Sequence, residues 1–202
     1  VVVFYGSEGL GLEGSQALSQ TAAALLHSHG KIGQPNNGLV AVWANGNTQG
    51  AFDMGFKPTP DLFGTLRSAG VLWIAGADPA GDDPALAEAV DAAGFVVVQE
   101  LFLTETARRA DIVLPAQSFA EREGTLTSGE LRVQRYYPAI RPTAETRPDF
   151  GIAAGIGSYF GVTLEGKVPS LVLRQIAAKN QAYAAVDYQR LAEAVDKDTA
   201  DI

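Results

Sequence analysis

Short apolar runs and helical apolar stripes alternate along the chain as far as Pro115. A short run rich in β-branched residues is typical of a strand buried on both faces, and apolar residues three or four positions apart are typical of a helix with one buried side. Five runs predict strands: Val1–Tyr5, Leu39–Trp43, Val71–Ala75, Phe95–Gln99 and Asp111–Leu114. Helices are predicted between them, ending near Gly30 in the first case and covering Leu62–Ser68, Asp83–Gly94 and Thr104–Arg109 in the others. This alternation predicts an α/β fold with a doubly wound, mainly parallel sheet and helices on both of its faces.

Local signals mark the ends of some elements. Asp83 can cap the helix that follows it, Pro84 suits the first turn of that helix, and Gly94 is a typical residue at its end. The Gly- and Asn-rich stretch from Asn45 to Gly55 has the composition of a loop. A loop of that length inside a compact domain suggests a site or an interface.

The pattern changes beyond Pro115. A Gly- and Ser-rich arm contains a short alternating run through Leu131, Val133 and Arg135, and a helix is then predicted from Pro148 to Gly161. The stretch from Val168 to about Val195 is helical in pattern. We therefore predict two domains, an α/β domain over residues 1–161 and a C-terminal helical extension over residues 162–202.

Composition and charge exclude several classes of function. The 202 residues are 47% apolar and carry a formal charge of −8, and the 15 Lys and Arg residues form no basic run, so nucleic acid is not an expected partner. Cysteine is absent, which removes disulfides, cysteine-held iron–sulfur clusters and a cysteine nucleophile from this segment. The apolar runs are too short for a bilayer span, so we expect no direct membrane insertion. Because the chain starts inside an apolar run without an initiator Met, we expect it to be a piece of a longer polypeptide.

A glycine motif near the start allows a nucleotide interpretation. Gly9, Gly11 and Gly14 form G-x-G-x-x-G between the first predicted strand and helix, where a dinucleotide pyrophosphate would meet a helix N-terminus. Such a site also needs an acidic residue at the end of the second strand to bind the ribose, and after Glu13 the next acid is Asp53. A flexible glycine loop is therefore favoured over a nicotinamide or flavin site.

Other candidate chemistry also has a simpler interpretation. His27 and His29, the only histidines, would point in nearly opposite directions on a helix and cannot easily share a metal ion. The sequence contains no nucleophile elbow, Walker loop or H-E-x-x-H motif. Several carboxylates lie near predicted strand ends, but solvated charge or helix capping explains them better than acid–base catalysis: Glu100, Glu105, Asp111, Glu121 and Glu123. We expect no catalytic residue and no metal ligand in this segment.

Two separated stretches resemble the molybdopterin oxidoreductases. Phe95 to Gln134 contains T-E-T-A from Thr104 and A-D-I-V-L-P from Ala110, and later E-G-T from Glu123 followed by R-V-Q from Arg132. Upstream, the stretch from Asn47 to Gly55 reads N-T-Q-G-A-F-D-M-G, and Gly76, Asp78 and Pro79 are similar to the family's G-x-N-P turn. The resemblance covers about residues 1–161. Ser128 and Leu131 depart from the family pattern.

The resemblance implies a structural role or a cofactor site. In catalytic members of the family, loops at the carboxyl ends of the strands face the nucleotide tail of a molybdenum cofactor. If a pterin nucleotide is bound here, the resemblance places it against Asn47, Gly76, Asp78, Glu100, Thr104 and Asp111. A basic residue facing phosphate would support that site, and Arg108, Arg109 and Arg132 are candidates.

The resemblance is closest to the large iron–sulfur subunit of bacterial NADH:quinone oxidoreductase, respiratory complex I, because Pro35 to Leu39 reads P-N-N-G-L. The chain would then be a structural domain without cofactors of its own. The parent chain would hold iron–sulfur clusters and contact other peripheral-arm subunits on the cytoplasmic face of the cell membrane. The alternative is a molybdopterin guanine dinucleotide-binding domain of a formate-dehydrogenase-like enzyme. On either interpretation, apolar surface left without neighbours should make the isolated chain associate.

Overall fold

The computed structural model describes residues 1–6, 9–143 and 145–192. The chain divides into two compact units. Unit 1 contains residues 1–58 and 125–134, and unit 2 contains residues 59–124 and 135–202. The expected domain boundary at residue 161 lies inside unit 2 and stays a prediction.

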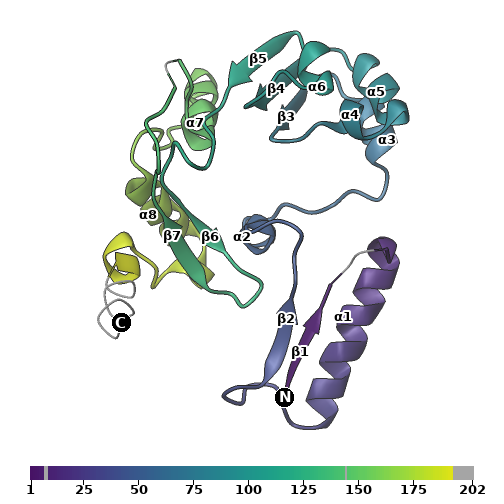
Figure 1. Cartoon of the computed structure of the whole chain (residues 1–202), viewed down its shortest axis with the longest axis vertical. Helices are drawn as coiled ribbons and strands as arrows, with labels where there is room; N and C mark the ends of the chain where they lie inside the picture. Colours follow the sequence, from purple (N-terminus) through teal and green to yellow (C-terminus); the bar gives the residue numbers. More distant parts are fainter. Residues whose placement is uncertain (7–8, 144, 193–202) are drawn as a thin grey trace. The chain divides into compact units, whose positions relative to one another are not determined.

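Unit 1 is built on two parallel strands. β1 (Val2–Tyr5) pairs with β2 (Gly38–Ala41), and α1 (Gly11–Ser28) connects them and lies beside the pair (Figure 1). Gly30 ends this helix as predicted, because its φ of 61° lets Lys31 N–H turn back to donate to the Leu26 carbonyl at 2.9 Å. The first two predicted strands and the first helix are thus present.

The stretch from Asn45 to Gly55 is not the predicted loop throughout, because α2 (Thr48–Asp53) forms inside it. Composition pointed to a loop, but tertiary packing favours a helix here: the ring of Phe52 lies edge-on to Trp43 with their centroids 5.3 Å apart. The prediction for this stretch is therefore wrong over six residues. The reason is an aromatic contact that local composition does not reveal.

Unit 2 contains a parallel sheet of three strands in the order β3 (Leu72–Ala75), β4 (Val96–Glu100) and β5 (Ile112–Pro115). α3 (Leu62–Arg67) precedes β3, and the connections between the strands contain α4 (Pro79–Asp82), α5 (Pro84–Asp91) and α6 (Glu105–Arg108). Asp83 caps α5 as predicted, accepting from Ala85 N–H at 2.8 Å. The predicted α/β class is confirmed, with its parallel strands divided between a two-stranded and a three-stranded sheet.

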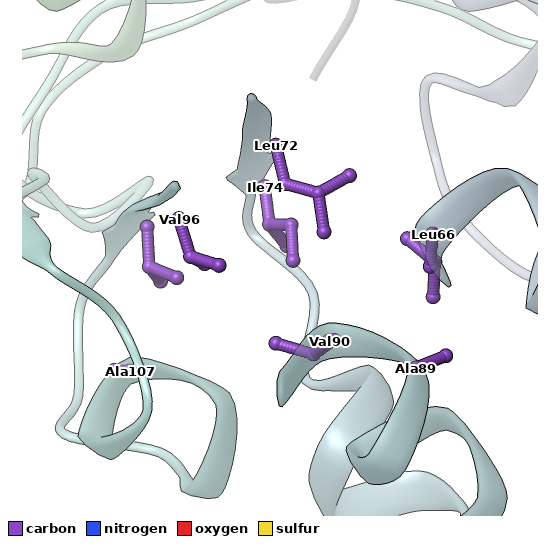
Figure 2. Close-up of a cluster of buried hydrophobic side chains, with 8 residues drawn as sticks. Leu66, Leu72, Ile74, Ala89, Val90, Val96 and Ala107 are labelled. Atoms are coloured by element: carbon purple, nitrogen blue, oxygen red, sulfur yellow. The ribbon is translucent and has the colours of Figure 1, made fainter. Parts of the chain in front are cut away.

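One face of the three-stranded sheet forms the core of unit 2. Leu72, Ile74 and Val96 point from the strands toward Val90 on α5 (Figure 2), and Val98 completes the row with no exposed surface. The opposite face is less covered, since Trp73 and Ile112 are each 45% exposed. We predicted helices on both faces of the sheet. In this three-stranded sheet, α5 covers the face that carries Leu72, Ile74, Val96 and Val98, and the face that carries Trp73 and Ile112 is partly exposed.

The rest of the chain follows β5. β6 (Gly124–Thr127) and β7 (Val133–Tyr136) form a two-stranded hairpin, which is followed by α7 (Asp149–Tyr159), α8 (Pro169–Lys179) and a short 3₁₀ helix at Gln181–Tyr183. The predicted helix from Val168 to about Val195 is therefore interrupted after Lys179, and its last three residues lie outside the described residues.

Arg135 links the second strand of the hairpin to the C-terminal segment. Its guanidinium lies 4.3 Å from the ring centre of Tyr137 and 4.5 Å from that of Tyr188, and it pairs with Glu123. Burial, followed by the charge of Glu123, raises the pKa of Tyr188 to about 12. The phenol therefore stays neutral throughout the physiological pH range.

We expect Val98→Ala to lower the free energy of unfolding by about 2 kcal/mol, because it removes two fully buried methyl groups and leaves a cavity. Val97→Ala is the matched control, since Val97 is the neighbouring residue of the same strand and only partly buried. Urea denaturation of both variants measures the difference. Equal losses would contradict the assignment of the core to the Val98 face.

Candidate functional site

Four of the six residues predicted for a nucleotide site lie at the carboxyl edge of the three-stranded sheet. Gly76 and Asp78 follow β3, Glu100 ends β4, and Thr104 lies in the loop after it. Gly76 N–H donates to the Gln99 carbonyl at 3.0 Å, so the turn after β3 stays against the end of β4. The φ of Gly76 is 63°, a conformation that favours glycine. Ligands of open α/β sheets bind at this edge.

Asp78 joins the loops that follow β3 and β4. Its Oδ1 accepts from the N–H and the hydroxyl of Thr106, at 2.8 and 2.7 Å, and from Gly81 N–H at 3.3 Å. These bonds, led by the Thr106 hydroxyl, lower the pKa of Asp78. Thr106 itself is fully buried and also accepts from Ala80 N–H at 3.0 Å. Sequence reasoning missed Thr106, although it stands inside the T-E-T-A motif.

Glu100 and Thr104 each accept a hydrogen bond from a nearby backbone N–H group. Glu100 Oε1 accepts from Leu101 N–H at 2.6 Å, and Thr104 caps α6 by accepting from Ala107 N–H at 3.1 Å. Among the described residues, the structure gives no hydrogen bond to Oε2 of Glu100, whereas the Asp78 carboxylate is occupied by its bonds to Thr106 and Gly81. The edge therefore presents one oxygen of the Glu100 carboxylate that can accept from a ligand.

Asp111 lies at the other edge of the sheet. Its Oδ2 accepts from Val96 N–H at 2.7 Å, and its own N–H donates to the Val96 carbonyl at 2.9 Å. Both residues stand where their strands start. The structure thus does not bring Asp111 together with Glu100 and Thr104, and its carboxylate stabilises the start of β4.

Asn47 belongs to unit 1. It precedes α2, and its Oδ1 accepts from Thr127 N–H at 2.9 Å, which ties the hairpin arm to this loop. Next to it, a pocket of about 740 Å³ opens at the carboxyl ends of β1 and β2. Its lining is uncharged and includes three aromatic rings: Tyr5, Gly11, Ser15, Gln16, Ser19, Trp43, Ala44, Asn45, Thr48, Phe52 and Pro58.

The glycine motif of the sequence lies at the start of α1. Gly11 and Gly14 lie within α1, where Gly11 is the first helical residue, and only Gly9 precedes the helix. A flexible loop was therefore also an incorrect expectation for most of the motif. The residues after β2 include no acid up to Asp53, as the sequence indicated.

The candidate cations have acidic partners or lie in the hairpin. Arg109 pairs with Asp91 at 2.7 Å, and Arg108 lies 3.7 Å from Glu105. Arg132 is exposed and belongs to unit 1. Within the described ranges, no three His, Cys, Asp or Glu residues are grouped as metal ligands, and no helix is long and apolar enough to cross a membrane.

Comparisons with known proteins agree on one family. The model of the molybdopterin oxidoreductases matches residues 2–159. A Staphylococcus haemolyticus protein whose name assigns it provisionally as a formate dehydrogenase is 29% identical over 91% of this chain and 22% of its own length. Two Staphylococcus aureus proteins with the same provisional name are 44% and 42% identical over 48% of this chain and 10% of theirs. The chain thus spans at most about a fifth of these relatives.

We expect Thr106→Val to cost more stability at neutral pH than in acid. The pKa of Asp78 is lowered below its ordinary value of 3.8, so its bonds stabilise the fold above that value and are lost as the pH falls through the lowered pKa. The variant removes the largest of these bonds. Denaturant titrations at several pH values should therefore show the difference from wild type shrinking below about pH 4.

Thr146→Val is the control for this measurement, because its hydroxyl donates to the Thr143 carbonyl at 2.7 Å and involves no carboxylate. Its cost should not change with pH. A cost of Thr106→Val that is equally constant would show that Asp78 does not depend on the Thr106 hydroxyl.

Proposed function

The chain belongs to the molybdopterin oxidoreductase family, and from this premise we propose that it is the nucleotide-binding part of a formate-dehydrogenase-like oxidoreductase. The carboxyl edge of β3, β4 and β5 holds the guanosine end of a molybdopterin guanine dinucleotide. The names of the relatives support formate dehydrogenase over the expected complex I subunit.

The observation that carries this proposal is the Glu100 carboxylate at the end of β4, whose Oε2 has no hydrogen-bond partner among the described residues. Guanine presents N–H donors at N1 and at its exocyclic amino group, and ribose presents hydroxyl donors. An ionised carboxylate accepts from two such donors side by side. The turn at Gly76 has no side chain beyond its Cα, so the ligand can approach the backbone closely there.

The charges at this edge fit the nucleoside better than the pyrophosphate. Two carboxylates repel phosphate, and Arg109 is already paired with Asp91 near the end of α5. The pyrophosphate and the pterin therefore lie against other parts of the parent protein. When bound, the molybdopterin group supplies the metal centre for two-electron oxidation, and this chain's residues bind and orient its nucleotide.

The second candidate function is that of a structural domain in the large subunit of complex I. The P-N-N-G-L segment favours this candidate. The structure explains that segment as a turn before β2: Asn36 has a φ of 57°, and Asn37 donates to the Pro35 carbonyl at 2.8 Å. Turn chemistry alone therefore accounts for these asparagines. The expected place in a membrane-associated complex with other subunits stays a prediction.

Metal and nucleotide analysis of the full-length protein separates the two candidates. Molybdenum or tungsten together with guanine nucleotide released on denaturation supports the formate-dehydrogenase-like function. Iron and sulfide without either of them supports the structural domain of complex I.

We expect Glu100→Gln to weaken guanosine diphosphate binding about 10- to 100-fold, because a hydrogen bond to a charged group contributes about 1.5–3 kcal/mol. Isothermal titration calorimetry measures the change. Glu105→Gln is the control, since Glu105 is an exposed carboxylate on α6 that lies near Arg108. Absence of binding by the wild-type chain, or equal binding by both variants, would contradict the proposed site.

A further inference from the structure

Gln99, the residue before Glu100, is a buried amide at the end of β4. Only 2% of its surface is exposed. Its backbone carbonyl accepts from Gly76 N–H at 3.0 Å, and its Nε2 donates to Asp149 Oδ1 at 2.6 Å. This one residue therefore connects the turn after β3 with a residue 50 positions later in the chain.

Asp149 is held in this position from two sides. It is the first residue of α7, and its second carboxylate oxygen pairs with Arg122. Two residues earlier, Arg147 N–H donates to the Pro115 carbonyl at 3.2 Å, and the Arg147 carbonyl accepts from Gln117 N–H at 2.9 Å. The segment 147–149 thus lies along the end of β5 and reaches β4 through the Asp149 side chain.

The position of Glu100 depends on this arrangement. Neighbouring residues of a strand point to opposite faces, so Gln99 and Glu100 project to opposite sides of the same strand end. A strand end can rotate or slide only if both side chains move. The Gln99–Asp149 bond on one face therefore limits where the Glu100 carboxylate lies on the other.

We propose that Asp149, paired with Arg122, is a positioning residue that fixes the Glu100 carboxylate for recognition of the guanine base. This inference rests on the proposed function, because it needs a nucleotide at the edge of the sheet. Asp149 does not touch the ligand. It acts by keeping the Nε2 of the buried Gln99 amide bonded, which is the one side-chain hydrogen bond that the described residues give Gln99, since its Oε1 has no partner among them. A buried amide that loses this bond as well favours a strand end that moves toward water.

The test compares guanosine diphosphate with inosine diphosphate, which lacks the exocyclic amino group. A well-placed Glu100 carboxylate binds both N–H donors of guanine, so the wild-type chain should prefer guanosine diphosphate about tenfold. In Asp149→Ala this preference should fall to about twofold or less. A loss of folded protein would weaken the binding of both nucleotides equally and leave the ratio of their two affinities unchanged.

Two further variants make the result specific. Asp149→Asn keeps an oxygen that accepts from Gln99 and should restore most of the preference, even though it loses the charge that pairs with Arg122. Asp91→Ala breaks a carboxylate–arginine pair with Arg109 and should leave the preference as in wild type. Urea denaturation of every variant measures the folded fraction under the binding conditions.

The outcomes separate the two proposals. If Glu100→Gln loses the preference for guanosine diphosphate over inosine diphosphate but Asp149→Ala retains it, the positioning role of Asp149 is wrong. The proposed nucleotide site is then still supported. If the folded wild-type chain binds neither nucleotide, the proposed function and this inference both fall. A preference lost in Asp149→Ala, restored in Asp149→Asn and unchanged in Asp91→Ala supports the positioning role.

Discussion

The pairing of β4 on both sides is the constraint on which unit 2 depends. Its backbone bonds to β3 and to β5, and Val96 and Val98 pack against the helices of one face. Because all three strands run parallel, their carboxyl ends must lie at one edge, and the polar loops that follow them meet there. The buried valines and the polar residues at the end of the strand are thus two results of one arrangement.

The local elements could be predicted well from the sequence, because their signals are local. The strands lie within two residues of the predicted runs at each end, and the Asp83 cap and the Gly30 helix end have the expected geometry. Four candidate residues meet at one edge for the same reason, since parallel strands bring their ends together. Asp111 failed to join them because it precedes its strand instead of following it.

The remaining features depend on contacts that no local pattern contains. α2 forms inside a loop-like composition because Phe52 packs on Trp43, and Asp78 finds Thr106 across 28 positions. The P-N-N-G-L segment forms a turn, where the positive φ of Asn36 and the Asn37 side-chain bond to Pro35 suit asparagine for local reasons and do not distinguish two branches of one family.

The aromatic residues have a consequence for spectroscopy. The chain's two tryptophans are divided between the units: Trp43 borders the pocket of unit 1, and Trp73 lies on the half-open face of the sheet in unit 2. Replacing either one by phenylalanine leaves a tryptophan in the other unit alone, and its emission can be excited apart from that of the tyrosines. Emission from the two single-tryptophan proteins therefore distinguishes concerted from stepwise melting of the units without any added label.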